Sequence, residues 1–112
     1  MAQRTHAKHL NIAEAAQILG VSAARARKLF DEGYLSGFRL GSSRRRIFLE
    51  GLVRVLSDKK DPDDRVECLG RLIFLLRDSG RYVDLGALPG IFLRVKWPNG
   101  GEILRLVLKQ SS

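Results

Sequence analysis

Two short helices, separated by only a few residues, are marked near the start of the chain by clear start and stop signals. Asn11 is a good helix N-cap, and Glu14 stands three positions later, where its carboxylate can bond back to the Asn11 backbone N–H. Gly20 ends this helix, since glycine readily adopts the left-handed conformation. Ser22 caps a second helix, which Gly33 terminates. Two helices joined by so short a turn are typical of a helix-turn-helix.

The second of these helices, expected over residues 23–32, is cationic on its exposed side. Ala26, Leu29 and Phe30 share one helical face and should pack inward. The small, polar and basic residues that could approach a polyanion are Ser22, Ala23, Ala24, Arg25, Arg27 and Lys28. Arginine can make paired hydrogen bonds to guanine, and alanine allows close approach to thymine methyl groups. The alternative interpretation is a face that is simply solvated.

A short β-hairpin is predicted directly after the two helices. Residues 35–40 and 44–48 are β-prone runs on either side of a glycine- and serine-rich tip. The residues of this hairpin that could contact nucleic acid are Arg39, Ser42, Ser43, Arg44, Arg45 and Arg46. A basic hairpin beside a helix-turn-helix is called a wing, and a solvated loop is the alternative here.

The two faces of the hairpin are expected to differ. Because side chains alternate along a strand, Arg45 should face the opposite side from its two arginine neighbours. Arg39 has two possible roles, which are a contact with DNA or an ion pair with Asp31 or Glu50. A helix over residues 49–57 would then close the unit.

A longer pattern runs through residues 9–57. Its members are Asn11, Glu14, Ala15, Ala16, Leu19, Gly20, Val21, Ser22, Gly33, Leu35, Gly37, Arg39, Gly41, Arg44, Arg45, Ile47 and Leu52. In this order and spacing they resemble the MerR-like winged helix of the excisionase family. The resemblance implies a bacterial or phage DNA-binding domain, with the second helix in the major groove and the wing on the adjacent minor groove or backbone. Arg25 and Gly51 depart from the family pattern, which often has Thr or Ser and an acidic residue there.

A polar, proline-interrupted stretch separates a first domain, residues 1–57, from a second, residues 58–112. In the second domain, Asp61 is a helix N-cap followed by proline, and the helix should run to about Ser79. This long helix is apolar on more than one side, so it should pack against two partners. We therefore expect a homodimer through residues 62–109, and packing within one chain is the alternative.

A β-hairpin is predicted at the end of the chain. Asn-Gly at positions 99–100 stands between two alternating runs, residues 91–97 and 102–109, which is a strong short-range hairpin signal. An isolated hairpin is marginal in water. It would need cover from a helix, from a further strand at residues 82–85, or from a second chain. The expected fold class is thus α+β: a winged helix-turn-helix, a long helix and a C-terminal hairpin.

The charge balance favours a polyanionic partner. The 112 residues carry a formal net charge of +8, and 45% of them are hydrophobic, which is enough for a folded core. Residues 1–57 hold ten basic and four acidic side chains, whereas residues 58–112 hold ten and eight. A basic surplus in a small domain is typical of nucleic-acid binding, and the first half is its expected location.

No catalytic, cofactor or metal-binding constellation is apparent in the sequence, so we expect neither an enzyme nor a cofactor. His6 and His9 lie in a polar N-terminal stretch and are expected to be solvated. Cys68 is the single cysteine, which excludes an intramolecular disulfide, and it should be buried in the long helix. No apolar run is long enough to cross a membrane, and no signal peptide is evident. The expected location is the cytoplasm, in association with the nucleoid.

The leading interpretation is sequence-specific binding of double-stranded DNA by a small bacterial or phage transcription regulator. One alternative is an excisionase-type architectural factor that sets recombination directionality. Another is a protein-interaction adaptor that uses the winged helix to bind a protein. RNA binding is less favoured, because the basic half offers few aromatic residues on which bases could stack. Those residues are Phe30, Tyr34, Phe38 and Phe48.

Overall fold

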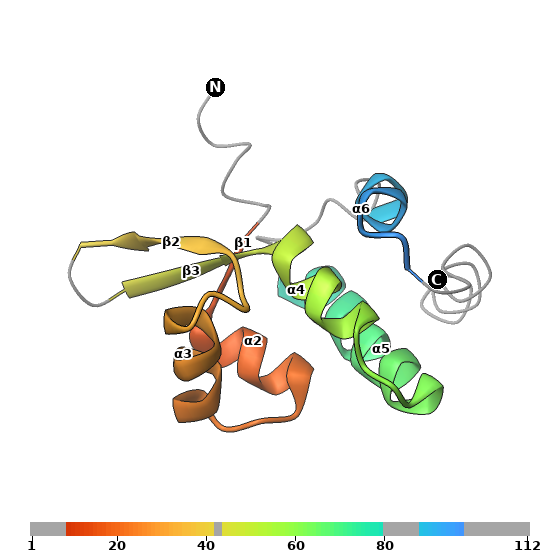
Figure 1. Ribbon diagram of the computed structural model, residues 1–112, viewed down its shortest axis with the longest axis horizontal. Coiled ribbons are helices and arrows are strands. Elements are labelled where there is room, and N and C mark those ends of the chain that lie inside the picture. The colour runs from red at the N-terminus through yellow and green to blue at the C-terminus, as the bar shows by residue number, and fades with distance from the viewer. Residues whose placement is uncertain (1–8, 42–43, 80–87, 98–112) are drawn as a thin grey trace.

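The computed structural model describes residues 9–41, 44–79 and 88–97, and it combines helices with one antiparallel sheet (Figure 1). The elements in chain order are β1 (His9–Asn11), α2 (Ile12–Leu19), α3 (Ala23–Asp31), β2 (Gly37–Leu40), β3 (Arg44–Phe48), α4 (Leu49–Ser57), α5 (Pro62–Ser79) and α6 (Leu88–Val95). This mixture agrees with the expected α+β class. Within the described ranges, no helix is both long enough and apolar enough to span a membrane.

Helices α2 and α3 begin and end where the capping residues predict. The Asn11 side chain accepts a hydrogen bond from the Glu14 backbone N–H at 2.8 Å, and the Glu14 carboxylate accepts one from the Asn11 N–H at 3.0 Å. Gly20 follows α2 in the left-handed region, with φ of 75°. The Ser22 hydroxyl accepts from the Arg25 N–H at 3.1 Å and so caps α3. Local chemistry therefore fixes the short turn between the two helices.

The sheet has three antiparallel strands in the order β1-β3-β2, and its first strand was not predicted. Leu10 pairs with Ile47 across β1 and β3, and both side chains are fully buried. His9 is only 6% exposed and meets the Phe38 ring edge-on, with 5.2 Å between centroids. The expectation of a solvated His9 is therefore wrong. A strand of three residues is too short for its alternation to be recognised in the sequence.

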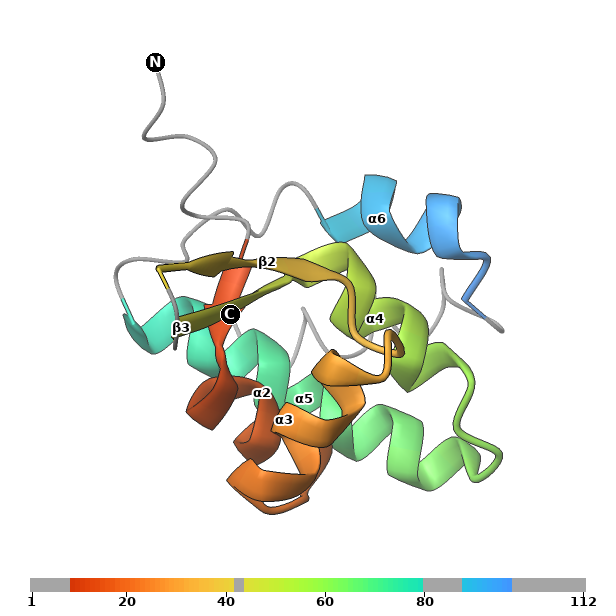
Figure 2. The ribbon, with the colours of Figure 1, turned by 60° about the vertical axis from the view of Figure 1, so that its left-hand side comes forward.

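One hydrophobic core draws residues from both predicted halves of the chain. Helix α5 packs against α2 and against α4, so two elements of the same chain cover it (Figures 1 and 2). Arg71 of α5 also donates from Nε to the Ile18 carbonyl of α2 at 3.1 Å. Cys68 is buried in this core, as predicted. Val66 and Phe74 on the outer side of α5 remain 39% and 56% exposed.

Gly51 allows α4 to lie close to the segment that leads into β2. A Cβ atom at this position would collide with the Ser36 hydroxyl and would lie 3.1 Å from the Ser36 backbone nitrogen. Glycine in a helix costs about 1 kcal/mol relative to alanine. At this position the close approach of Ser36 gives a packing reason for its presence. Any larger side chain would push the helix away from this segment.

The C-terminal part of the described chain differs from the prediction. Residues Leu88–Val95 form the helix α6, whereas a β-strand was predicted over residues 91–97. The buried residues of α6 are Leu88, Ile91, Phe92 and Val95. Their spacing is helical, and Leu93, which the strand would have placed inside, is 80% exposed. The predicted strands at residues 82–85 and 102–109 lie outside the described residues.

Candidate nucleic-acid interface

Helix α3 is held by only a small part of its surface. Ala26 is fully buried, and Leu29 and Phe30 are half-buried, as their shared face predicts. The predicted contact residues of this helix and its cap are all exposed, and they are Ser22, Ala23, Ala24, Arg25, Arg27 and Lys28. In both ribbon views α3 lies at the edge of the molecule, next to α2 and below the sheet (Figures 1 and 2). A helix so placed can meet a large partner without any rearrangement of the core.

The start of α3 combines a cap with a free donor. Because the Ser22 oxygen accepts from the Arg25 N–H, its hydroxyl hydrogen can still be donated outward. The first turn of a helix also carries partial positive charge from its backbone N–H groups. This end of α3 is therefore suited to an anionic oxygen, such as that of a phosphate group.

The β2–β3 hairpin is tied to the far end of α3 by Asp31. Arg45 donates to this carboxylate through two atoms, Nε to Oδ1 at 3.0 Å and Nη2 to Oδ2 at 3.1 Å. Arg39 donates from Nη2 to Oδ1 at 3.0 Å. Of the two partners that were open for Arg39, the structure thus selects Asp31. The hydrogen bonds from Arg45 hold the pKa of Asp31 below its usual value of 3.8, so its carboxylate is charged at neutral pH.

The remaining arginines of the hairpin face the other way. Arg44 and Arg46 lie on the opposite side of the strand from Arg45, as strand alternation predicts. Arg44 is exposed, whereas Arg46 is half-buried and its Nε atom has no hydrogen-bond partner among the described residues. Ser42 and Ser43, which were also predicted to contact DNA, lie outside the described residues. The hairpin therefore divides its arginines between two faces.

A small open hollow lies where the hairpin meets the start of α2. Its volume is about 260 Å³, and its lining consists of Asn11, Ile12, Arg44, Arg45 and Arg46. None of these five residues is acidic. The hollow is thus a basic surface feature that could receive an anionic group of modest size.

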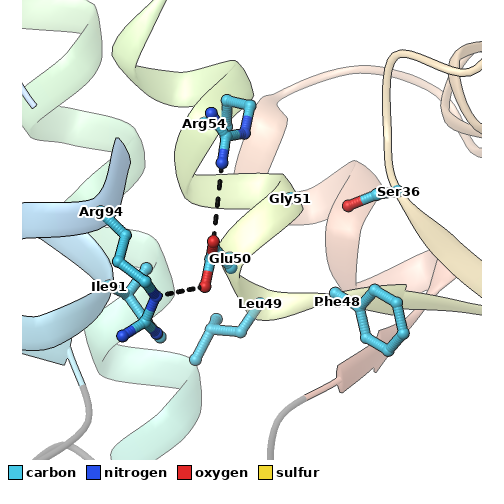
Figure 3. Close-up of a pocket in the computed structure, with 8 residues that line it drawn as sticks. All are labelled: Ser36, Phe48, Leu49, Glu50, Gly51, Arg54, Ile91 and Arg94. Carbon is cyan, nitrogen blue, oxygen red and sulfur yellow. Dashed lines mark hydrogen bonds and ion pairs between the residues drawn. The ribbon is translucent and has the colours of Figure 1, made fainter. Parts of the chain in front are cut away.

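A second hollow, of about 320 Å³, lies between α4 and α6 (Figure 3). Glu50 lies between two arginines of its lining: Oε1 accepts from Arg94 Nε at 2.8 Å, and Oε2 lies 3.5 Å from Arg54 Nη2. Both arginines therefore share one carboxylate, which balances one of their two positive charges. We assign this cluster a structural role in joining α6 to α4. The described residues also contain no group of three or more His, Cys, Asp or Glu side chains that could hold a metal ion.

Sequence reasoning missed the central place of Asp31 in this interface. It named Asp31 only as one possible partner of Arg39, and it did not connect Asp31 with Arg45. The link depends on the pairing of Arg39 with Arg45 across the hairpin, which puts both side chains on the side that faces α3. The pairing of Arg39 with Arg45 is set when the hairpin folds. In the sequence, strand alternation is the only pattern that indicates which hairpin residues share a face.

Comparison of the chain with protein-family models, with curated proteins and with solved structures finds no significant match. The family resemblance noted in the sequence therefore remains an expectation. The function has to be inferred from the exposed helix, the basic hairpin and the charges between them.

Proposed function

We propose that the chain binds double-stranded DNA through α3 and the β2–β3 hairpin. The observation that carries this proposal is the exposure of α3, with Arg25, Arg27 and Lys28 on its surface and no acidic residue before Asp31. A nine-residue helix is about 14 Å long and fits within the major groove. The exposed side of the helix, away from α2, is free to enter that groove.

The proposed division of roles follows from the chemistry of the side chains. Arg25 and Arg27 can each bond to a guanine edge, and each such contact is worth about 1–3 kcal/mol of discrimination. Ala23 and Ala24 are small enough for close approach to thymine methyl groups. Exposed Arg44 would contact the phosphate backbone beside the groove. In this proposal α2 and α3 are a helix-turn-helix, and the hairpin is its wing.

Regulation of transcription is the proposed role of this DNA binding, in line with the resemblance to small bacterial and phage regulators. An architectural role in recombination is the alternative. Footprinting on selected sites separates the two. One compact palindromic site supports the regulator, whereas a series of direct repeats with bent DNA supports the architectural factor.

The proposal includes a homodimer that forms through the outer side of α5. Val66 and Phe74 lie on this side at equal distances along the helix from Gly70, and both are partly exposed. In an antiparallel pair of α5 helices that cross at Gly70, Val66 would meet the Phe74 of a second copy, and acidic Asp63 would meet basic Arg77. Sedimentation at micromolar concentration tests the dimer, and Phe74→Glu should then yield monomers. A wild-type chain that sediments as a monomer would exclude it.

DNA binding itself is tested by fluorescence anisotropy with a labelled duplex of random sequence. Several phosphate contacts should weaken binding by orders of magnitude between about 50 and 200 mM salt. Lys28→Glu, on α3, should weaken binding strongly. Lys60→Glu, in the exposed loop between α4 and α5, makes the same charge change away from the interface and should have a small effect.

Two results would contradict the proposal. Equal weakening by Lys28→Glu and Lys60→Glu would mean that α3 does not form the interface. No binding at low salt would remove DNA as the partner. The basic surface would then belong to a protein-interaction adaptor, which a pull-down with Arg27→Glu and Arg45→Glu as controls would identify.

A further inference from the structure

Two arginines of the hairpin converge on a single carboxylate at the surface. Both Arg39 and Arg45 donate to Asp31, and Arg45 does so through two parallel hydrogen bonds. The Asp31 side chain is 42% exposed and that of Arg39 is 46% exposed. Arg27 lies one helical turn before Asp31, so the cluster adjoins the basic side of α3. Asp31 and Arg39 are therefore open to solvent and continuous with the proposed DNA interface, whereas most of the Arg45 side chain is covered.

The geometry around Asp31 is one that a phosphate group can reproduce. A guanidinium binds carboxylate and phosphate in the same way, with two parallel N–H donors directed at two anionic oxygens. Asp31 thus occupies the position that two phosphate oxygens would take between Arg39 and Arg45. Arg45 is only 17% exposed and holds Asp31 through two hydrogen bonds, so the carboxylate is displaced only by a group, such as phosphate, that offers two oxygens to the same donors.

We propose that Arg39 and Arg45 form a phosphate-binding site that Asp31 occupies in the free protein. Asp31 then competes with the phosphates of DNA and lowers the affinity for duplexes of unrelated sequence. A cognate site, which also bonds to α3, holds the protein long enough for phosphate to replace the carboxylate. The identity of the polyanion as DNA rests on the proposed function, whereas the anion site itself does not.

Asp31→Asn tests the competition, because it removes the charge and keeps the shape of the side chain. Binding to a random-sequence duplex should tighten roughly tenfold at low salt, and the salt slope should steepen by about 1–2, since each new phosphate contact adds about 0.9. Asp78→Asn is the matched control, because Asp78 also lies beside an arginine, Arg77, at 3.7 Å but on α5. It should leave the slope unchanged.

A second variant and a second readout show whether Arg39 and Arg45 cause the gain in duplex affinity of Asp31→Asn. Adding Arg45→Gln to Asp31→Asn should abolish most of the gain in affinity. In the wild-type protein, the NMR signal of the Arg45 Nε–H should shift when a saturating duplex displaces Asp31. An unchanged signal in the bound state overturns the proposal, and so does an Asp31→Asn variant that binds duplex no more tightly than Asp78→Asn.

Heparin, a sulfated polyanion without bases, separates this inference from the proposed function. Asp31→Asn should elute from heparin at higher salt than Asp78→Asn, whether or not the protein binds DNA. If the wild type binds no duplex but this difference is seen, the proposed function fails and the anion site stands. If both variants elute together, the anion site is overturned while DNA binding through α3 can still hold.

Discussion

Glu50 of α4 and Arg94 of α6 are joined by a hydrogen bond of 2.8 Å between Oε1 and Nε, although 44 positions separate them in the sequence (Figure 3). Their side chains are 36% and 59% exposed. An ion pair with this exposure contributes about 0–1 kcal/mol. The attachment of α6 to α4 must therefore come mainly from the buried side chains beside the pair, among them Ile91 and Phe92.

Truncation of Phe92 should be far more damaging than truncation of Arg94. Phe92 is 5% exposed and its ring lies 4.8 Å from that of Trp97, so Phe92→Ala should lower the free energy of unfolding by about 3–5 kcal/mol. Arg94→Ala should lower it by less than about 1 kcal/mol. Urea denaturation measures both values. Similar losses for the two variants would mean that the ion pair, and not the apolar contact, holds α6.

The elements with local signals could be predicted from the sequence, and those that depend on tertiary contacts could not. The ends of α2 and α3 follow from Asn11, Gly20 and Ser22, whose caps involve residues at most four positions away. Residues 91–97 satisfy an alternating pattern as well as a helical one. Leu88 decides between them, since it is buried with α6 and extends the helical spacing by one turn.

The exposed face of α3 could be predicted from its residue types. Which hairpin arginines pair with α3 and which face away from it could not be predicted. Strand alternation correctly separates Arg45 from Arg44 and Arg46. It does not say which face meets α3, because that depends on how the sheet packs against the helices. Only the fold brings Asp31 to Arg45 across 14 positions of sequence.

Two helical glycines should respond in opposite ways to alanine. Gly51→Ala places a Cβ against Ser36, and the resulting strain, about 1–3 kcal/mol, should exceed the gain of about 1 kcal/mol in helix propensity. Gly70 of α5 has open space at its Cβ position, so Gly70→Ala should stabilise the fold by up to about 1 kcal/mol. Thermal unfolding of both variants provides the check. A stabilising Gly51→Ala would contradict the close approach to Ser36.

Stability should fall in acid because two aspartates have lowered pKa values. Hydrogen bonds from Arg45 lower the pKa of Asp31, and a hydrogen bond from Lys59 lowers that of Asp64, both from a usual value of 3.8. A lowered pKa in the folded state contributes stability above the unfolded value, and this contribution is lost as the pH falls through the folded pKa. The free energy of unfolding should therefore decrease below about pH 4.

The matched variant for this pH dependence is the double substitution Asp31→Asn with Asp64→Asn. It removes both titrations, so its unfolding free energy should change less between neutral pH and pH values below about 4 than that of the wild type. Urea denaturation over the pH range gives both curves. Parallel curves would show that other carboxyl groups cause the acid sensitivity.

Cys68 should react slowly with thiol reagents as long as the protein is folded. Its side chain is fully buried, and burial raises the pKa of the thiol above its usual value of 9.0, so little thiolate forms at neutral pH. Its sulfur also accepts a hydrogen bond from Arg71 Nη2 at 3.3 Å. Reaction with a chromogenic disulfide should proceed at the rate of unfolding and become fast in urea. Rapid reaction of the native protein would instead indicate that α5 opens readily from the core.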